Sequence, residues 1–340
     1  MHPGKTTDSS QPRPTVFIPE PRAETKSLDV LREVAEVKLG DSHRKYTEDE
    51  LLEEARDADA LIISSRDAIS RRIIEGCPKL KIISKRGAKP SNVDIEAATE
   101  RGIPVTWTPG SNAVSVAEHA LMMILAQIKR LIQSMNGQKN GKWRGDLVPG
   151  KELSGKTVGI IGLGQAGSEL AKRLSCFGVR IVAYDPYVPR ERAEQHNIEM
   201  LGLEALLKIS DIVTLHCDLA EETRHLIGAQ QLKQMKKNVH LVNTARGGLI
   251  DTGALYDALK EGLIAGAALD VFEEEPTERG NPLFSLENVL HTPHMAGITH
   301  ESVGREPVWA AEEVVRVLKG EPPKNVVNPQ YVNNISIKRK

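Results

Sequence analysis

The chain has 340 residues, of which 40% are hydrophobic and 27% are charged, and its formal net charge is −1. This charge gives no electrostatic attraction for nucleic acid or an anionic membrane, and the length favours two domains over one hydrophobic core. The three cysteines are scattered and odd in number, which disfavours a disulfide framework or a metal-ligand cluster and fits a reducing compartment. We therefore expect a cytoplasmic protein without a metal.

The first 110 residues are predicted to form a small α/β domain. Residues 1–14 are polar and lack an apolar signal segment, so we expect a disordered leader there. Thr47, with Glu50 three residues later, predicts a capping box at the start of a helix within 46–60. Strand-like runs alternate with helical patterns in this part of the chain, at residues 16–18, 60–64, 80–84 and 105–107.

The middle of the chain predicts a second and larger domain. Residues 112–131 are mostly apolar and contain neither Pro nor Gly, which indicates a buried helix bridging the two domains, and a loop is expected over 136–155. Six strand-like runs are expected to complete a doubly wound parallel sheet, at residues 158–162, 180–184, 212–216, 240–243, 266–270 and 289–292.

The helical pattern at 301–318 comes after the last of these strands, so we expect it to return to the first domain. The first domain is then discontinuous, and the predicted division is a leader at 1–14, a first domain at 15–110 and 300–332, a second domain at 111–299 and a basic tail at 333–340.

The segment 158–167, with the sequence VGIIGLGQAG, is typical of a dinucleotide-binding turn. Gly162 permits the tight turn, Gly164 lets the backbone approach a pyrophosphate, and Gly167 lets the next helix pack closely on the strand. The alternative is a glycine-rich turn in an ordinary α/β core. That alternative is disfavoured because a strand precedes the turn and a helical pattern follows it.

Asp185 lies at the end of the next strand-like run, eighteen residues past Gly167. Its carboxylate is placed to accept hydrogen bonds from both ribose hydroxyls and would repel a 2′-phosphate. The sequence therefore favours NAD over NADP, although Arg190 and Arg192 weaken that preference.

Three further segments follow predicted strands and carry polar side chains suited to catalysis. They contain Arg246, the acidic run at 270–275 and His294. Taken singly, each has an ordinary explanation as a surface arginine, a solvated acidic turn or an inert loop histidine. Taken together, an imidazole, a carboxylate that orients it and an arginine that binds a carboxylate suit the redox chemistry of 2-hydroxy and 2-oxo acids.

With these motifs the chain resembles the D-isomer-specific 2-hydroxyacid dehydrogenase family, which includes phosphoglycerate dehydrogenases, glycerate and hydroxypyruvate reductases and phosphite dehydrogenase. The matching segments are residues 112–119, 162–167 with Asp185, 243–248, 266–276 and 292–294. The resemblance implies two Rossmann-like domains, an NAD-binding doubly wound parallel sheet and a smaller flavodoxin-like substrate domain. It also implies a homodimer joined through the bridging helix and the loop after it.

The resemblance implies NAD-dependent hydride transfer between a small D-2-hydroxy acid and its 2-oxo acid. By position, Arg246 would bind the substrate carboxylate, Glu275 would orient the catalytic histidine, and His294 would be the acid/base. The implied cofactor-binding residues are Gly162, Gly164, Gln165, Ala166, Gly167, Asp185, Thr244, Ala245, Asp270, Ala296 and Gly297.

The chain departs from the family in the loop at 86–94. Relatives carry Gly-x-Gly-x-Asp-Asn here, and the backbone N–H groups of that loop receive the substrate carboxylate. Gly87 and Asn92 match this pattern, whereas residues 89–91, Lys-Pro-Ser, do not. Lys89 either selects a substrate with a second anionic group or points to solvent. The expected substrate-binding residues are Gly87, Ala88, Lys89 and Arg246.

Two other functions stay open from the sequence. One is an NAD-sensing, corepressor-like interaction protein, because such relatives keep the dehydrogenase fold and even its catalytic residues. The other is a phosphite-type oxyanion dehydrogenase, which Lys89 suggests, although the loop lysine of phosphite-oxidising relatives stands about one position earlier.

Overall fold

The computed structural model describes residues 12–21, 25–41, 43–87, 89–189, 193 and 197–335. The chain divides into two compact units, one of Met1–Ser111 with His300–Lys340 and one of Asn112–Thr299. Most of the expected leader, Ala88 and residues 336–340 of the expected basic tail lie outside the described residues. Within the part of the chain that is described, no helix is both long and apolar enough to span a membrane.

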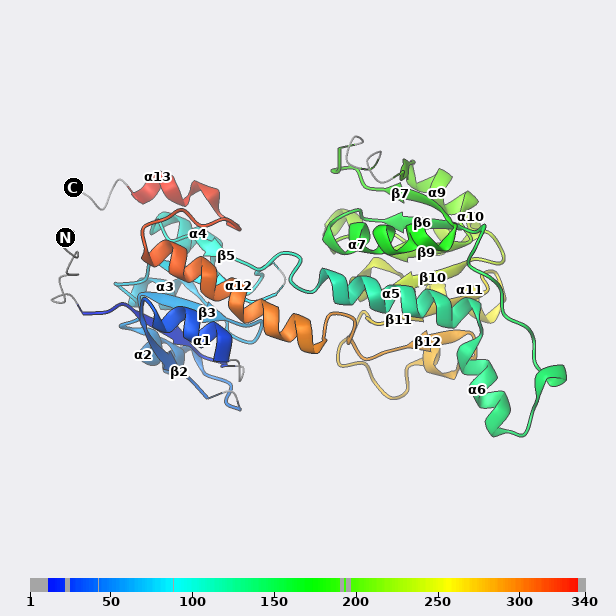
Figure 1. Ribbon diagram of the computed structural model, residues 1–340, viewed down its shortest axis with the longest axis horizontal. Helices are drawn as coiled ribbons and strands as arrows, with labels where there is room; N and C mark the ends of the chain where they lie inside the picture. The colour runs from blue at the N-terminus through cyan, green and yellow to red at the C-terminus, as the bar shows by residue number, and fades with distance from the viewer. Residues whose placement is uncertain are drawn as a thin grey trace, which may run out of the picture. The chain divides into compact units, whose positions relative to one another are not determined.

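The first unit is built on a five-stranded parallel sheet with the strand order β2-β1-β3-β4-β5 (Figure 1). This is the flavodoxin-like order, so that expectation is confirmed. The sheet has one strand more than the sequence predicted, because β2 is an edge strand with mostly exposed side chains and a weak apolar pattern. The strands are β1 (Thr15–Ile18), β2 (Glu36–Leu39), β3 (Ala60–Ile63), β4 (Ile82–Lys85) and β5 (Val105–Thr106).

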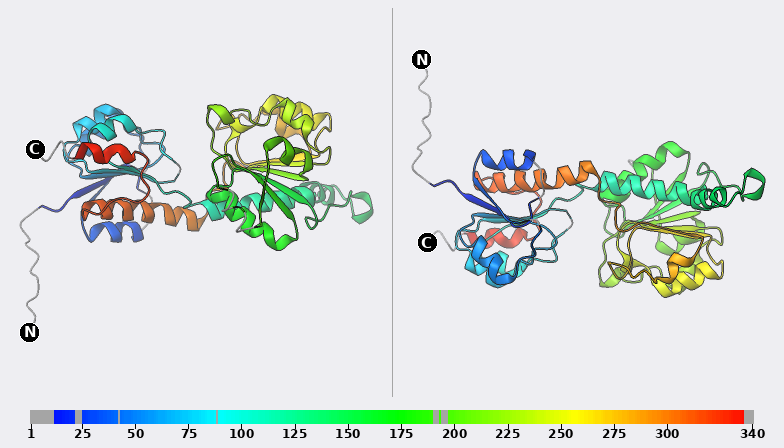
Figure 2. Two further views of the ribbon diagram at one scale, coloured as in Figure 1. Left: turned by 90° about the horizontal axis from the view of Figure 1, so that it is seen from above. Right: turned by 90° about the horizontal axis from the view of Figure 1, so that it is seen from below.

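Helices cover both faces of this sheet (Figure 2). On one face, Val16 and Ile18 of β1 pack in a buried cluster with Ala310 and Val314. On the other face, Phe17 of the same strand joins a second cluster with Ile73, as the alternation of side chains along a strand requires. The helices of this unit are α1 (Thr25–Arg32), α2 (Glu48–Ala55), α3 (Arg71–Gly76), α4 (Ile95–Glu100), α12 (His300–Leu318) and α13 (Val332–Ile335).

The two ends of the chain contribute ordered contacts to the first unit. The carbonyl of Pro14 accepts a hydrogen bond from the Glu36 N–H at 2.8 Å, and the Asn334 amide donates to the Thr99 carbonyl at 2.8 Å. Pro14, at the end of the predicted leader, and Asn334, near the start of the predicted tail, thus both make contacts within the first unit. The predicted capping box at Thr47 is confirmed, and α2 ends at Ala55, inside the predicted stretch 46–60.

The second unit is built on a seven-stranded parallel sheet with the order β12-β11-β10-β9-β6-β7-β8. This is the doubly wound order 3-2-1-4-5-6 with one more strand, so the predicted fold is confirmed. The predicted count of six strands is wrong because β8 is two residues long and pairs only with β7. The strands are β6 (Thr157–Ile161), β7 (Arg180–Tyr184), β8 (Glu199–Met200), β9 (Ile212–Leu215), β10 (His240–Asn243), β11 (Gly266–Leu269) and β12 (Val289–His291).

Helices also cover both faces of the second sheet. Met123 of α5 (Ala113–Ile128) and Leu170 of α7 (Gln165–Leu174) lie in one buried cluster. Leu206, Leu232 and Leu255 lie in the cluster on the other face. These three leucines belong to α9 (Leu203–Ile209), α10 (Ala229–Gln234) and α11 (Thr252–Lys260).

The helix predicted over 112–131 is wrong at its end. It stops at Ile128, and Arg130 adopts the left-handed conformation with φ of 54°. A separate helix, α6 (Leu131–Lys139), then begins at the last residue of the predicted helix and extends into the loop predicted over 136–155. The sequence contains no Gly or Pro at this break, so nothing in the pattern indicated it.

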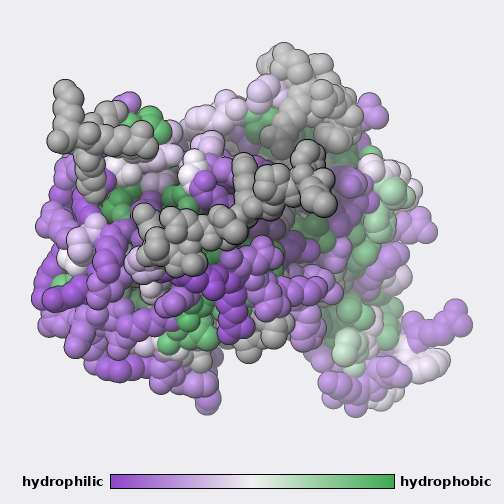
Figure 3. Space-filling model, turned by 60° about the vertical axis from the view of Figure 1, so that its left-hand side comes forward, coloured by the Kyte–Doolittle hydropathy of each residue, from purple (hydrophilic) through white to green (hydrophobic). Residues whose placement is uncertain are grey.

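Large apolar side chains are exposed along α5, α6 and the segment that follows. Figure 3 shows hydrophobic side chains among polar ones at the lower right, where α6 lies. The exposed residues are Met122, Leu131, Ile132, Met135, Trp143 and Val148, and we call this set the α6 patch.

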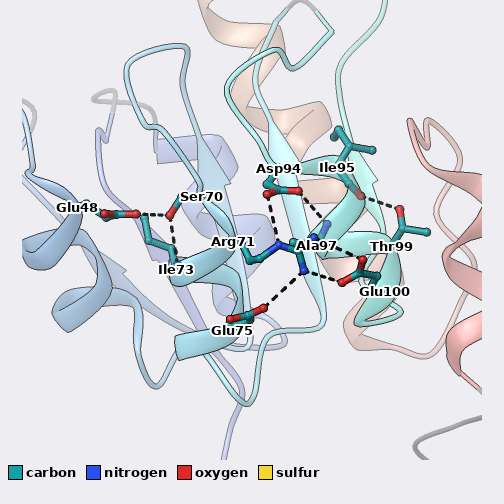
Figure 4. A network of polar contacts seen from close by, with 10 residues as sticks. All are labelled: Glu48, Ser70, Arg71, Ile73, Glu75, Asp94, Ile95, Ala97, Thr99 and Glu100. Atoms are coloured by element: carbon teal, nitrogen blue, oxygen red, sulfur yellow. Dashed lines mark hydrogen bonds and ion pairs between the residues drawn. The ribbon is translucent and has the colours of Figure 1, made fainter.

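A polar network on the first unit joins two short helices (Figure 4). The Arg71 guanidinium, on α3, lies 2.6 Å from Glu100 of α4 and 3.6 Å from Glu75. Asp94 caps α4 by accepting the Ala97 N–H at 2.8 Å. Because these charges are substantially exposed, the network contributes only weakly to the stability of this unit.

Candidate active site

The turn between β6 and α7 has the geometry of a phosphate-binding turn. Gly162 has φ of 93°, and a Cβ there would lie 2.5 Å from the Cys217 nitrogen. A Cβ on Gly167 would lie 2.2 Å from the Gly162 carbonyl oxygen, so only glycine allows this approach of helix and strand. A Cβ on Gly164 would meet nothing within 4 Å, which leaves the helix N-terminus open to an anion.

Gln165 and Ala166 are the first two residues of α7, where the Gln165 side chain is exposed and Ala166 is half-buried. Nearby, at the carboxyl end of β9, burial lowers the pKa of His216 to about 4 and raises the pKa of Cys217 to about 11. Both groups are therefore uncharged at neutral pH.

The Asp185 carboxylate holds the turn in place. It accepts hydrogen bonds from the backbone N–H groups of Leu163 at 2.8 Å, Tyr187 at 2.9 Å and Val188 at 3.2 Å. Asp185 thus joins the β6–α7 turn to the turn after β7. The sequence indicated only a ribose contact, because backbone partners cannot be recognised from side-chain identity. Arg190 and Arg192 lie outside the described residues.

The turn after β10 presents Arg246 at its tip. The buried Asn243 side chain donates to the Arg246 carbonyl at 2.8 Å and accepts the Ala245 N–H at 3.0 Å. The guanidinium is exposed and contacts the Ala245 carbonyl at 2.6 Å. The Thr244 hydroxyl is buried and has no hydrogen-bond partner among the described residues, so a bound ligand can satisfy it.

His294 and Glu275 form a direct pair at the ends of β12 and β11. The His294 Nδ1 lies 2.6 Å from Glu275 Oε2, while Glu275 Oε1 accepts the Phe272 N–H at 2.9 Å. His294 has φ of 55° and a half-exposed side chain. Because the carboxylate contacts Nδ1, the nitrogen that stays available for a substrate is Nε2.

The Asp270 carboxylate fixes the loop that carries His294. It is fully buried and accepts the backbone N–H groups of Met295 and Ala296, both at 2.8 Å, as well as the Thr292 hydroxyl. The His294 N–H donates to the Asp270 carbonyl at 2.8 Å. These bonds hold a left-handed backbone that a non-glycine residue adopts at a cost of about 1–2 kcal/mol.

His119 on α5 completes this network, and sequence reasoning assigned it no role. Its Nε2 lies 3.0 Å from the Thr292 hydroxyl and 3.6 Å from Asp270 Oδ1. The sequence signal that could have identified His119 is its position in the segment 112–119, which matches the family. Gly297 lies against α5 as well, because a Cβ there would lie 2.7 Å from the Asn112 amide nitrogen.

The loop after β4, in the first unit, carries the substrate-binding residues that the sequence predicted. Gly87 has φ of 81°, and its N–H donates to the Thr108 hydroxyl at 2.7 Å. Lys89 is exposed, and Ala88 lies outside the described residues. The buried Arg86 donates to the Glu20 carbonyl at 2.8 Å. Among the described residues, no cluster of three or more His, Cys, Asp and Glu side chains is arranged to hold a metal ion.

Residues 121–296, more than half of the chain, match the family model of the D-isomer specific 2-hydroxyacid dehydrogenase, NAD binding domain. The chain belongs to this family. NAD is therefore the cofactor, as the sequence predicted. The matched residues lie in the second unit, which is the NAD-binding domain.

Relatives within the dehydrogenase family differ in length. A D-3-phosphoglycerate dehydrogenase of Methanocaldococcus jannaschii is 44% identical over 314 residues, which are 92% of this chain and 59% of that protein. A glyoxylate reductase of Thermofilum pendens is 42% identical over 332 residues, which are 94% of this chain and 96% of that protein. The chain thus spans about three fifths of the phosphoglycerate dehydrogenase but nearly all of the glyoxylate reductase.

Solved structures of 2-hydroxyacid dehydrogenases share the fold. The D-lactate dehydrogenase from Aquifex aeolicus, complexed with NAD and lactic acid, has a TM-score of 0.76 and 30% identity, covering 92% of this chain and 99% of that one. A glyoxylate reductase from Paecilomyes thermophila has a TM-score of 0.82 and 28% identity, covering 94% of this chain and 100% of that one.

Proposed function

We propose that this protein is an NAD-dependent oxidoreductase that interconverts a small D-2-hydroxy acid and its 2-oxo acid. The observation that supports this most strongly is the His294–Glu275 pair, with 2.6 Å between Nδ1 and Oε2. Both residues follow parallel strands of the sheet whose β6–α7 turn is suited to a dinucleotide, and ligands of doubly wound sheets bind at that edge.

In this proposal, each polar residue of the site has one role in reduction of the 2-oxo acid. Arg246 binds the substrate carboxylate through its exposed guanidinium. His294 donates a proton from Nε2 to the carbonyl oxygen, and Glu275 stabilises the imidazolium beforehand and orients the ring. Bound NADH supplies the hydride that reduces the carbonyl carbon. In the oxidation direction, His294 accepts the hydroxyl proton at the same atom.

The cofactor-binding residues of the proposal fall into two groups. The first group, Gly162, Gly164, Gln165, Ala166, Gly167 and Asp185, binds the pyrophosphate and ribose, and the open N-terminus of α7 supports this assignment. The second group lies toward the nicotinamide, where the buried and unpartnered Thr244 hydroxyl supports the assignment. Its members are Thr244, Ala245, Asp270, Ala296 and Gly297.

Gly87, Ala88 and Lys89 are proposed to contact the substrate, with Lys89 selecting a second anionic group. The exposed side chain of Lys89 and its place past the carboxyl end of β4 support this role. The relatives include enzymes named for a phosphorylated acid and enzymes named for glyoxylate, so family membership does not choose between the two substrate classes.

The protein is proposed to be a cytoplasmic homodimer. The α6 patch supports a dimer, because large apolar side chains exposed on one stretch of the chain are suited to an interface between two copies. Three free cysteines support a reducing compartment. The molecular mass in solution, measured by light scattering, tests the dimer, and a monomer at micromolar concentration would contradict it.

The function is tested by following NADH oxidation with five 2-oxo acids, namely glyoxylate, hydroxypyruvate, phosphohydroxypyruvate, 3-sulfopyruvate and oxaloacetate. Phosphite is tested in the NAD-reducing direction. We expect turnover of at least one oxo acid, with preference for a dianionic one if Lys89 is a selector. Phosphite oxidation would instead support the oxyanion dehydrogenase, and NADH binding without any turnover would support the corepressor-like protein.

A further inference from the structure

A second histidine–carboxylate pair lies close to the proposed catalytic one. The His225 Nε2 is 2.5 Å from Glu273 Oε1, and Glu273 Oε2 accepts the Thr252 N–H at 3.2 Å. Glu273 precedes Glu275 by two residues. His225 also shares the left-handed backbone of His294, with φ of 50°. Such a conformation persists in a non-glycine residue only where its surroundings hold it.

His225 is attached to the chain segment that carries Arg246. Its backbone N–H donates to the Gly248 carbonyl at 2.8 Å, and the Ile227 N–H donates to the Leu249 carbonyl at 3.0 Å. Gly248 lies two residues past Arg246. The His225 side chain therefore links the Arg246 turn to the segment of Glu273.

The same two segments touch through their backbones. A Cβ on Gly247 would lie 1.9 Å from the carbonyl carbon of Phe272, so the Arg246 turn lies directly against the Phe272–Glu273 peptide. The Phe272 N–H in turn donates to Glu275 Oε1 at 2.9 Å. A displacement of this peptide would change the position of Arg246 and of Glu275 together.

The Glu273 carboxylate is charged at neutral pH. Burial acts to raise its pKa, but hydrogen bonds from Thr252 and His225 outweigh burial and hold the pKa of Glu273 below its usual range. A carboxylate that accepts from two separate segments is a strong link between them.

We propose that His225 and Glu273 are a positioning pair that sets the relative placement of Arg246 and the Glu275–His294 pair. This inference rests on the proposed roles of those three residues. The two members of the pair act on the reaction only through their contacts with the Arg246 turn and the 272–275 segment. Glu274, which lies between the two acidic residues and is exposed, has no part in it.

The alternative is that the pair only stabilises the fold. A purely stabilising pair would, when removed, lower the melting temperature and the fraction of active protein, and would leave the KM for the oxo acid unchanged. A positioning pair would raise that KM, because Arg246 is displaced, and would lower kcat, because Glu275 is displaced.

The experiment compares Glu273→Ala, His225→Ala and the double variant with Glu274→Ala as the matched control. With the best oxo acid, we expect each single variant to lower kcat/KM on the order of 10- to 100-fold, with a raised KM and an unchanged Kd for NADH. The double variant should be no worse than either single one, because the two residues act as a unit. Glu274→Ala should match the wild type.

Two conservative variants keep the test valid if the alanine variants do not fold. Glu273→Gln and His225→Gln each keep a polar group of similar length, so both should recover part of the lost kcat/KM. An unchanged KM in every folded variant, or additive losses in the double variant, would overturn the proposal. His294→Ala is measured alongside, because wild-type turnover in that variant would contradict the proposed catalysis itself rather than the positioning pair.

Discussion

The carboxyl edges of the two sheets differ in how firmly they hold the residues proposed to act. In the second unit, buried polar side chains bind the backbone of the turns, namely Asn243 after β10 and Asp270 after β11. In the first unit, the loop after β4 contains Gly87, held by Thr108, and the exposed Lys89 two residues later. The first unit has such contacts as well, since the buried Asp67 accepts the Ser64 N–H at 2.7 Å. The difference therefore lies in the residues proposed to act: the loop of His294 is held by a buried carboxylate, whereas the Lys89 side chain is exposed.

This difference suggests a division of roles. Acid–base catalysis depends on groups held within hydrogen-bond distance of the reacting atoms, and small displacements reduce the rate strongly. Buried carboxylates such as Asp270 supply such placement when their oxygens accept several backbone N–H groups. Substrate selection only requires different affinities for different substrates, and an exposed lysine on a loop can supply that difference.

The largest expected effect comes from removing the proposed acid/base, His294, from the second unit. We expect His294→Ala to lower kcat about 10²- to 10⁴-fold, because the proton donor is lost while the cofactor is bound by other residues. Glu275→Gln should have a smaller effect in the same direction, because the ring keeps a hydrogen-bond partner but loses the charge. Steady-state kinetics measures kcat, and NADH fluorescence titration measures the Kd for NADH, which should stay unchanged. A His294→Ala protein with wild-type kcat would contradict the assignment.

A smaller effect is expected from the loop of the first unit. If Lys89 binds a second anionic group, Lys89→Ala should lower kcat/KM for phosphohydroxypyruvate about 10- to 100-fold and leave kcat/KM for glyoxylate unchanged, since a charge-assisted hydrogen bond contributes about 1.5–3 kcal/mol. The control is Lys45→Ala, an exposed lysine of the same unit. Equal losses on both substrates would show that Lys89 does not select the second group.

The sequence predicted the central strands well because each is a continuous apolar run between turn residues. It missed two of the four edge strands, β2 and β8, which are short and contain few apolar residues. It also missed the helix break at Arg130, which has no local signal.

The sequence indicated the candidate side chains of the site but not the contacts that hold them. Arg246 and His294 were chosen from residue type and position after strands, whereas Glu275 was selected from the acidic run at 270–275 only through the resemblance to the family. The second role of Asp185 and the His225–Glu273 contact were not predictable, because each depends on partners distant in sequence. The contact of His225 joins residues 48 positions apart. The acidic run at 273–275 was interpreted as a solvated turn when taken alone, yet two of its three carboxylates are paired with histidines.

The last expected effect concerns stability rather than activity, because buried titratable groups in the two units respond differently to pH. In the second unit, burial lowers the pKa of His216 to about 4, and burial with the nearby charges of Lys151 and Arg130 lowers the pKa of His240 to about 4. In the first unit, burial raises the pKa of the Asp67 carboxyl. A histidine with a depressed pKa takes up its proton more readily when unfolded, so its contribution to stability is complete above about pH 6.5 and falls as the pH drops toward about 4. A carboxyl with a raised pKa contributes in the opposite sense, because its stabilising effect is lost as the pH rises.

Acidification from pH 7 to pH 5 should therefore lower the free energy of unfolding through the second unit, by on the order of 1–2 kcal/mol for each buried histidine. Urea unfolding at the two pH values measures this loss. The loss should be smaller in His240→Gln, which removes one of the two buried imidazoles, and unchanged in His43→Gln, because His43 is exposed. If the free energy of unfolding fell as much between pH 7 and pH 5 in His240→Gln as in the wild type, the burial of His240 would not be a source of the pH dependence. The two units would then differ only in the contacts of their turns.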